Sequence, residues 1–397
     1  MDTLFEKSYR KVQSVSLGFT RSIMDDIRWD SRLIGIRGAR GVGKTTLLLQ
    51  YMKRFLPQDT SALYVSLDNI WFAEHRLLDL VDAFVKKGGR YLFVDEVHKY
   101  PSWSQELKNA YDDYPDLHLV FTGSSSLAIL NACADLSRRT VAYRMQGLSF
   151  REYLNISLSE SFPIFSLQDI LENHHEISAE VLKKVKPLQH FDRYLETGYY
   201  PFSFEAGELY CGLLEEVVSL ILEIELPRLR NVDISYVTNL KQLLLIIAES
   251  ASFTPNLQTL SEHIGINRAT LIAYLDYLRE AHLTKHLYRD SAGVGKLQKP
   301  DKIFLENTNL AYALAAHRAN LGSMRESFFF NQLEYRHKIA YPDKGDFLVD
   351  KKYTFEIGGK GKNSRQIYAL ENAYIAADDI EYGHENKIPL WMFGFLY

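Results

Sequence analysis

The sequence lacks most of the features that mark secreted and membrane proteins. It has only two cysteines in 397 residues, Cys133 and Cys211, and they form no CxxC pair, which argues against a zinc site and a disulfide framework. The N-terminus carries no basic segment followed by an apolar stretch, so we expect no signal peptide. The longest apolar runs, such as 243–248, are too short to cross a bilayer. We therefore expect a cytoplasmic protein with no membrane partner.

The sequence also has little net charge. Its 46 Lys and Arg residues against 50 Asp and Glu residues leave a formal charge of −4. This balance excludes a polybasic protein that coats nucleic acid, although it is compatible with a local basic patch. Aromatic residues are abundant instead, with 25 tyrosines and 22 phenylalanines. A chain of this length predicts two to three domains.

The motif around which the chain is organised is a glycine-rich loop at 38–45. It matches G-x-x-x-x-G-K-[ST] at each fixed position and consists of Gly38, Ala39, Arg40, Gly41, Val42, Gly43, Lys44 and Thr45. We predict a buried strand at 33–36 before it and a helix from Thr46 to residue 52 after it. Such a loop cradles phosphate because backbone N–H groups and the helix dipole favour an anion there. Lys44 would bind the β- and γ-phosphates of ATP, Thr45 would coordinate Mg²⁺, and Thr46 belongs to the same nucleotide-binding set.

A second motif combines four apolar residues with two carboxylates at 91–96. We predict a buried parallel strand here, which would deliver Asp95 and Glu96 at the carboxyl edge of the sheet, where ligands of α/β proteins bind. Asp95 would hold Mg²⁺ through its water shell, and Glu96 would orient and activate the attacking water. A strand that ends in Asp-Glu about fifty residues after such a loop is typical of a Walker B motif.

Two later segments offer further residues for phosphate chemistry. The segment 117–126 predicts a strand that ends in hydroxyl side chains. Its resemblance to AAA-type ATPases implies that Thr122 or Ser124 senses the γ-phosphate; a serine-rich helix cap is the alternative interpretation. Arg138 and Arg139 follow a short predicted helix. An arginine finger acting on a neighbouring subunit would require a homo-oligomer, whereas a surface salt bridge is the simpler explanation.

Four motifs in this order resemble those of a large prokaryotic family of AAA-like P-loop ATPases. They are 38–45 (GARGVGKT), 93–99 (FVDEVHK), 121–125 (FTGSS) and 147–154 (GLSFREYL). The resemblance implies an ATPase core, a winged-helix region and a C-terminal domain similar to PD-(D/E)xK nucleases. The family usually has Ser-Gly-Arg where this chain has Ser137-Arg138-Arg139, so Arg139 is the matching arginine and Arg138 is an addition.

The segment from residue 239 to residue 305 predicts a winged helix-turn-helix. Two helical patterns are joined by a turn at 265–267, which is the helix-turn-helix signature, and 283–288 and 302–305 predict a two-stranded wing. The helix after this turn should hold Leu271, Leu275 and Leu278 on one face, with Asn267, Thr270, Tyr274 and Tyr277 on another. Basic residues of the wing that would suit phosphate contacts are Lys285, Arg289, Lys296, Lys299 and Lys302. Both DNA binding and a role as a lid or protein contact are compatible with this pattern.

The C-terminal region carries three carboxylates in the order that PD-(D/E)xK nucleases use. Glu326 lies in a predicted helix, Asp346 and Glu356 on two short strands that can form a hairpin across residues 351 and 352. In such nucleases two carboxylates hold Mg²⁺, and a lysine two residues after the last acid stabilises the attacking hydroxide. Gly358 occupies that position here. Lys360 would reach the site only if the strand continued past two glycines, so we predict a nuclease-like fold without nuclease activity.

The sequence therefore predicts an α/β protein with four segments. These are an AAA-like P-loop core with a parallel sheet at 1–154, a helical linker or lid at 155–235, a winged helix at 236–310 and a small nuclease-like α/β domain at 311–397. The expected activity is Mg²⁺-dependent ATP hydrolysis coupled to conformational change. The alternatives are a nucleotide-gated switch that binds DNA or protein with little turnover, and an ATP-controlled nuclease.

Overall fold

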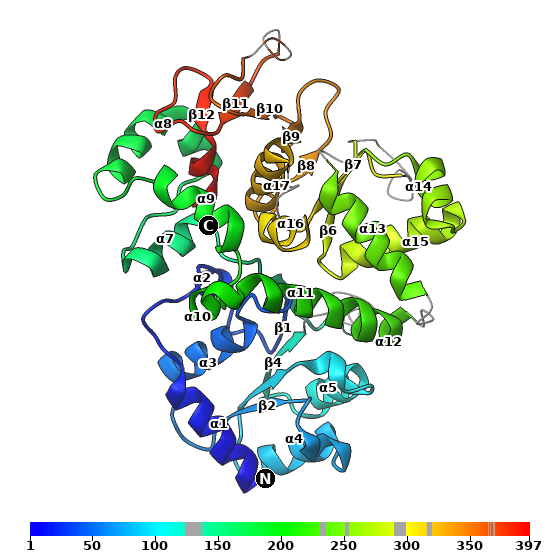
Figure 1. Ribbon diagram of the computed structural model, residues 1–397. Helices are drawn as coiled ribbons and strands as arrows, with labels where there is room; N and C mark the ends of the chain where they lie inside the picture. Colours follow the sequence, from blue (N-terminus) through cyan, green and yellow to red (C-terminus); the bar gives the residue numbers. More distant parts are fainter. Residues whose placement is uncertain are drawn as a thin grey trace. The chain divides into compact units, whose positions relative to one another are not determined.

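The computed structural model (Figure 1) describes residues 1–123, 136, 138–230, 236–250, 254–289, 299–315, 320–363, 365, 367 and 370–397. The chain forms two compact units, residues 1–147 and 148–397, and each is described by itself. Within the ranges above, we find no helix with both the length and the hydropathy that a membrane crossing requires.

The first unit is built on a five-stranded parallel sheet. Its strands are β1 (Leu33–Arg37), β2 (Ala62–Ser66), β3 (Tyr91–Asp95), β4 (His118–Gly123) and β5 (Val141–Arg144), and their order in the sheet is β2-β3-β4-β1-β5. The first four strands lie where the sequence predicts them. They could be predicted because each is an apolar run that the sheet buries on both faces. The sequence did not indicate β5, which lies at the sheet edge with half-buried and exposed residues.

Helices pack against this sheet and close its core. They are α1 (Asp2–Ser14), α2 (Ile23–Asp26), α3 (Lys44–Phe55), α4 (Leu77–Lys86) and α5 (Trp103–Asp113), with 3₁₀ turns at Ile70–Ala73 and Val97–Lys99. Fully buried residues of the core come from the strands and from several helices, for example Leu33, Leu92, Phe84, Leu107 and Phe121. Because β4 lies between β1 and β3, the carboxyl ends of these three strands meet at one edge of the sheet.

The second unit begins with a mainly helical segment. Its helices are α7 (Phe150–Leu158), α8 (Leu167–Leu182), α9 (Leu188–Thr197), α10 (Ser203–Ala206), α11 (Tyr210–Leu220) and α12 (Leu226–Arg230), with a 3₁₀ turn at Gly207–Leu209 and a π-helical turn at Ile221–Glu225. α7 starts at a capping box in which the Ser149 hydroxyl accepts from the Glu152 N–H and the Glu152 carboxylate accepts from the Ser149 N–H.

The predicted helix-turn-helix elements are present in the second unit. α13 (Val237–Glu249) is followed by α14 (Leu257–Ile264) and α15 (Arg268–Glu280). Gly265 ends α14 with φ +76°, a left-handed conformation that suits glycine, and the Asn267 side chain caps α15 by accepting from the Thr270 N–H. β6 (Thr284–Leu287) and β7 (Lys302–Leu305) then form an antiparallel pair. The assignment of these elements as a winged helix stays a prediction.

A mixed sheet forms the C-terminal part of the second unit. α16 (Thr308–Ala315) and α17 (Leu321–Leu333) precede β8 (Ile339–Ala340), β9 (Phe347–Val349), β10 (Tyr353–Gly358), β11 (Ala373–Ala377) and β12 (Lys387–Pro389), and a 3₁₀ turn at Leu390–Phe395 follows. The strand order is β12-β11-β10-β9-β8. The predicted hairpin is confirmed as β9–β10. Its turn holds Asp350 and Lys351 at positive φ, the backbone that tight hairpins require.

The tyrosine and phenylalanine content has its main structural use in the second unit. Helices and sheet share one core of edge-to-face and tilted rings, in which Phe150 meets Phe191 and Phe395, and Phe329 meets Phe355 and Phe393. Such pairs add to the stability that burial of the rings supplies.

Candidate nucleotide-binding site

The loop between β1 and α3 has the backbone geometry of a phosphate cradle. Gly41 and Gly43 adopt φ +85° and +97°, conformations that glycine reaches without strain. A side chain at Gly38 would place its Cβ 2.2 Å from the Met145 carbonyl oxygen, so only glycine lets the backbone approach there. Because Gly43 precedes the first residue of α3, the first N–H groups of that helix lie in the loop, as the sequence predicts.

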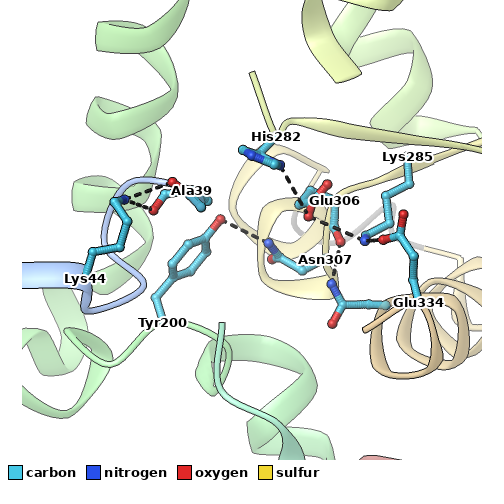
Figure 2. A network of polar contacts seen from close by, with 10 residues as sticks. Ala39, Lys44, Tyr200, His282, Lys285, Glu306, Asn307 and Glu334 are labelled. Carbon is cyan, nitrogen blue, oxygen red and sulfur yellow. Dashed lines mark hydrogen bonds and ion pairs between the residues drawn. The ribbon is translucent and has the colours of Figure 1, made fainter. Parts of the chain in front are cut away.

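Lys44 lies inside this loop. Its ammonium donates to the carbonyl oxygens of Gly38 and Ala39, each at 2.8 Å, and the residue is only 5% exposed (Figure 2). The cation is therefore held at the loop by its own backbone, where an incoming phosphate would compete with these carbonyls. Of the other predicted loop residues, Val42 is fully buried, Ala39 and Arg40 are half-buried, and Thr46 is exposed on the first turn of α3.

Asp95 is the hub of the polar contacts at the sheet edge. Its Oδ2 accepts from Thr45 Oγ1 at 2.6 Å and from the Tyr64 hydroxyl at 2.7 Å, and its Oδ1 accepts from the Thr122 hydroxyl. The structure thus joins Thr45 and Asp95, the two side chains that the sequence assigns to one metal ion. The sequence analysis did not identify Tyr64 as a site residue, because the sequence pattern marks it only as part of a strand.

The structure describes only one of the two candidate γ-phosphate sensors, Thr122. Thr122 is fully buried and its hydroxyl is bound to Asp95, so it orients the carboxylate from the neighbouring strand. Ser124 lies outside the described residues, and its assignment stays a prediction.

Glu96 leaves the strand in an unusual conformation. Its φ is +54°, a left-handed region that residues other than glycine rarely adopt and that is common at functional sites. Its side chain is 25% exposed, and its Oε2 lies 3.5 Å from Nε2 of His98. The turn therefore separates the directions of the two neighbouring carboxylates, with Asp95 directed inward and Glu96 partly accessible to water.

Arg21 is a buried cation that the sequence analysis did not identify. Its guanidinium donates to the carbonyl oxygens of Val42 at 2.8 Å, Gln146 at 2.8 Å and Gly147 at 2.7 Å. The segment that carries it is tied to α3, because Gln50 donates to the carbonyl oxygens of Ser16 and Phe19. No local motif marks this role, since it depends on carbonyl groups far away in the sequence.

Arg139, the predicted arginine finger, is held within its own unit. Its Nε and one terminal nitrogen donate to the two carboxylate oxygens of Asp112, at 2.8 and 3.0 Å. This bidentate pair matches the salt bridge considered as the alternative. Arg138 is exposed.

Several residues predicted to contact DNA are committed to other contacts. Lys285 and Lys302 are buried and paired with carboxylates, and Arg289 pairs with Asp301 and Asp343. Tyr274 is only 5% exposed and packs near Tyr236, so it belongs to the buried residues of α15. Lys299 is exposed, and Lys296 lies outside the described residues.

The C-terminal carboxylates are bound by lysines other than Lys360. Lys360 is exposed and its ammonium pairs with Asp379 at 3.0 Å. Lys362 Nζ instead lies 2.6 Å from Glu356 Oε1. Gly358 makes this possible, because a Cβ there would lie 2.7 to 2.8 Å from the Lys362 side chain.

The residues at the first unit's sheet edge fit a magnesium nucleotide. Among the residues that the structure describes, no group of three or more His, Cys, Asp or Glu side chains is arranged to hold a metal ion. Mg²⁺ needs no such cage, since it keeps several waters and is bound by one or two protein oxygens together with substrate phosphates. Thr45 and Asp95 supply that set.

Comparisons with known proteins agree with this geometry. Residues 30–154 match the family model for an AAA domain, and residues 188–321 match a domain of unknown function, DUF8612. "Uncharacterized protein MJ1637" of Methanocaldococcus jannaschii is 27% identical over 389 residues, which cover 90% of this chain and 81% of that protein.

The chain also has a weak likeness to two solved structures. The Walker-type ATPase PABY2304 of Pyrococcus abyssi has a TM-score of 0.41 and 11% identity, with 78% of this chain and 95% of that chain covered. AMPPCP-bound DnaA of Aquifex aeolicus has a TM-score of 0.25 and 14% identity, with 70% and 88% covered. Likeness at this level assigns no function. The match of residues 30–154 to the model for an AAA domain agrees with the phosphate-cradle geometry of the loop.

Proposed function

We propose that the first unit binds ATP together with Mg²⁺ and hydrolyses the γ-phosphate. The observation that carries this proposal is the 2.6 Å hydrogen bond between Thr45, at the start of α3, and Asp95, at the end of β3. It joins the phosphate loop to the Walker B carboxylate.

Each side chain at this edge has a role that follows from its position. Lys44 would exchange its two carbonyl contacts for phosphate oxygens, which accept a charge-assisted hydrogen bond. Mg²⁺, when bound, would neutralise phosphate charge, and Thr45 and Asp95 would hold it. Glu96 would accept a proton from, and so polarise, the attacking water. The left-handed backbone at Glu96 keeps this carboxylate apart from the one that faces the metal.

The test is ATP turnover by the full chain, with Asp95→Asn as the matched variant. The amide keeps the size of the carboxylate but removes its charge, so we expect hydrolysis to fall by orders of magnitude while the fold is kept. Equal turnover by both proteins would reject the proposal.

A second function from a different class is a nucleotide-gated switch with little turnover. The salt bridge between Arg139 and Asp112 favours this second function. An arginine finger that acts on a neighbouring subunit would first have to break that salt bridge. Single-turnover hydrolysis measured with and without DNA separates the two functions: a switch would hydrolyse slowly in both conditions, whereas a DNA-stimulated ATPase would accelerate.

The remaining sequence-based assignments stay proposals. They are a winged helix at 236–310 that contacts DNA or protein, a nuclease-like fold at 311–397, a homo-oligomer and a cytoplasmic location. Because the lysines of β6 and β7 are paired with carboxylates, we expect DNA to contact the exposed start of α15, where Arg268 lies, and not the two strands.

A further inference from the structure

The carboxylate of Glu96 has a histidine beside it. Glu96 begins the 3₁₀ turn Val97–Lys99 with φ +54° and ψ +42°, and the Lys99 N–H donates to the Glu96 carbonyl oxygen at 3.0 Å. This turn brings the side chain of His98 back to that of Glu96, so that Nε2 of the ring lies 3.5 Å from Oε2 of the carboxylate. An ionised carboxylate can only accept hydrogen bonds, and the ring nitrogen that faces it therefore acts as the donor.

The two side chains differ in their exposure. The His98 side chain is 3% exposed, whereas that of Glu96 is 25% exposed. Between them, Val97 is fully buried in the core of the first unit. Packing therefore fixes the position of the imidazole ring, while the carboxylate that it contacts still reaches water. A fixed donor can hold a flexible side chain in one direction, because the contact offsets part of the entropy that the side chain loses.

The two neighbouring carboxylates need separate orienting groups. Three hydroxyl groups, described above, donate to Asp95. The left-handed backbone at Glu96 directs the second carboxylate differently. A general base acts efficiently only when it is held within hydrogen-bond distance of the proton that it accepts. His98 is the group that the turn places against this carboxylate.

We propose that His98 is a positioning residue of the ATPase site, and that its Nε2–H holds the Glu96 carboxylate in the direction in which it meets the attacking water. This role rests on the proposed function, in which Glu96 activates that water. His98 keeps its own proton and needs no contact with nucleotide, so it acts through Glu96 alone. Its loss should therefore slow hydrolysis and leave the binding of ATP unchanged.

The test measures ATP turnover, ATP affinity and thermal unfolding of the full chain in three variants of His98. His98→Leu keeps apolar bulk and removes the donor. His98→Gln keeps an N–H donor of similar reach, and His98→Asn carries the same amide one carbon closer to the backbone. The control is His118→Leu, because His118 is the first residue of β4 and lies near the opposite end of that strand from Thr122.

We expect His98→Leu and His98→Asn to lower kcat about tenfold, the effect of losing one hydrogen bond to a charged group. His98→Gln should keep most of the native kcat, and ATP affinity should stay the same in all three variants. His118→Leu should hydrolyse ATP as the native chain does. In single-turnover measurements on Glu96→Gln, adding His98→Leu should cost no more than about twofold, because the histidine acts only through that carboxylate.

Native turnover by His98→Leu would overturn the proposal. Equal kcat in His98→Gln and His98→Asn would do so as well, and this pair decides the matter even if His98→Leu does not fold. A fall in ATP affinity that matches the fall in kcat, or a full tenfold loss added to Glu96→Gln, would also contradict it, since His98 would then act elsewhere.

The proposed function is judged separately, by the turnover of the native chain and of Glu96→Gln. If the native chain hydrolyses ATP and Glu96→Gln does not, the proposed function stands whatever the His98 variants do. If the native chain does not hydrolyse ATP, the proposed function fails, and the role of His98 fails with it.

Discussion

The Tyr64 hydroxyl and the Thr45 hydroxyl donate to the same oxygen of Asp95, at 2.7 and 2.6 Å. Tyr64 is 4% exposed. Its burial, and after that the charge of Asp95, raise the pKa of its hydroxyl well above the ordinary value. The group therefore keeps its proton throughout the neutral range and always acts as a donor. Tyr64 fixes the orientation of a carboxylate that our proposal assigns to the metal.

We expect Tyr64→Phe to weaken the binding of Mg²⁺ more than the binding of nucleotide. The ring and its packing are kept and one donor to Asp95 is lost, so hydrolysis should fall by roughly tenfold, in line with about 1.4 kcal/mol for a hydrogen bond to a charged group. The Mg²⁺ concentration for half-maximal rate should rise, while ATP affinity without Mg²⁺ should not change. Tyr91→Phe, at the opposite end of β3, is the control. Equal Mg²⁺ dependence in the two variants would limit Tyr64 to a structural role.

Lys44→Ala should lower ATP affinity at least tenfold while the fold is kept. The backbone of the loop already cradles the phosphates, but the ammonium supplies the positive charge that binds their oxygens. Isothermal calorimetry measures the affinity, and Lys53→Ala at the other end of α3 serves as a control. Unchanged nucleotide binding by Lys44→Ala would rule out the loop as the phosphate site.

Glu96→Gln should bind ATP as the native chain does and hydrolyse it slower by orders of magnitude. The amide keeps the shape of the side chain but cannot accept the proton of the attacking water. Calorimetry and a phosphate-release assay measure the two quantities separately. Turnover at the native rate would mean that another residue positions the water.

The second unit should not cleave DNA. The Lys302 ammonium lies between Glu326 and Asp346, and the Lys360 ammonium is paired with Asp379. Loss of one such stabiliser of the attacked phosphate typically costs about 10² to 10³ in rate. Linear and supercoiled DNA should stay intact in Mg²⁺ or Mn²⁺, with or without ATP. Nicking that disappears in both Asp346→Ala and Glu356→Ala would contradict this prediction and support the nuclease alternative.

The parts of the site that could be predicted are those that a short stretch of sequence encodes. Lys44, Asp95 and Glu96 follow from a loop and a strand end, because the chemistry requires those residue types at those spacings. Tyr64 and Arg21 could not be predicted, since their partners come from strands and turns many residues away. Their hydrogen bonds depend on sheet order and on the path of the N-terminal segment.

The helix-turn-helix region shows the limit of assigning function from exposed patterns. A lysine on a strand is expected to face solvent, yet Lys285 and Lys302 are buried because α17 and residue 334 supply carboxylates to the β6–β7 pair. Tyr274 lies on a different predicted helix face from Leu271 and Leu275, yet packing buries it as well. Long-range charge pairing decides such positions, and a single sequence does not reveal it.

The three hydrogen bonds of Arg21 connect the phosphate loop to the last residues of the first unit through a single guanidinium group. A guanidinium is planar, so it cannot follow the Val42 carbonyl without also pulling on the carbonyls of Gln146 and Gly147. A displacement of the loop on phosphate binding or release would therefore be transmitted as tension to residue 147, where the chain passes into its second unit. The nucleotide state would thus be readable at a point remote in sequence from the nucleotide.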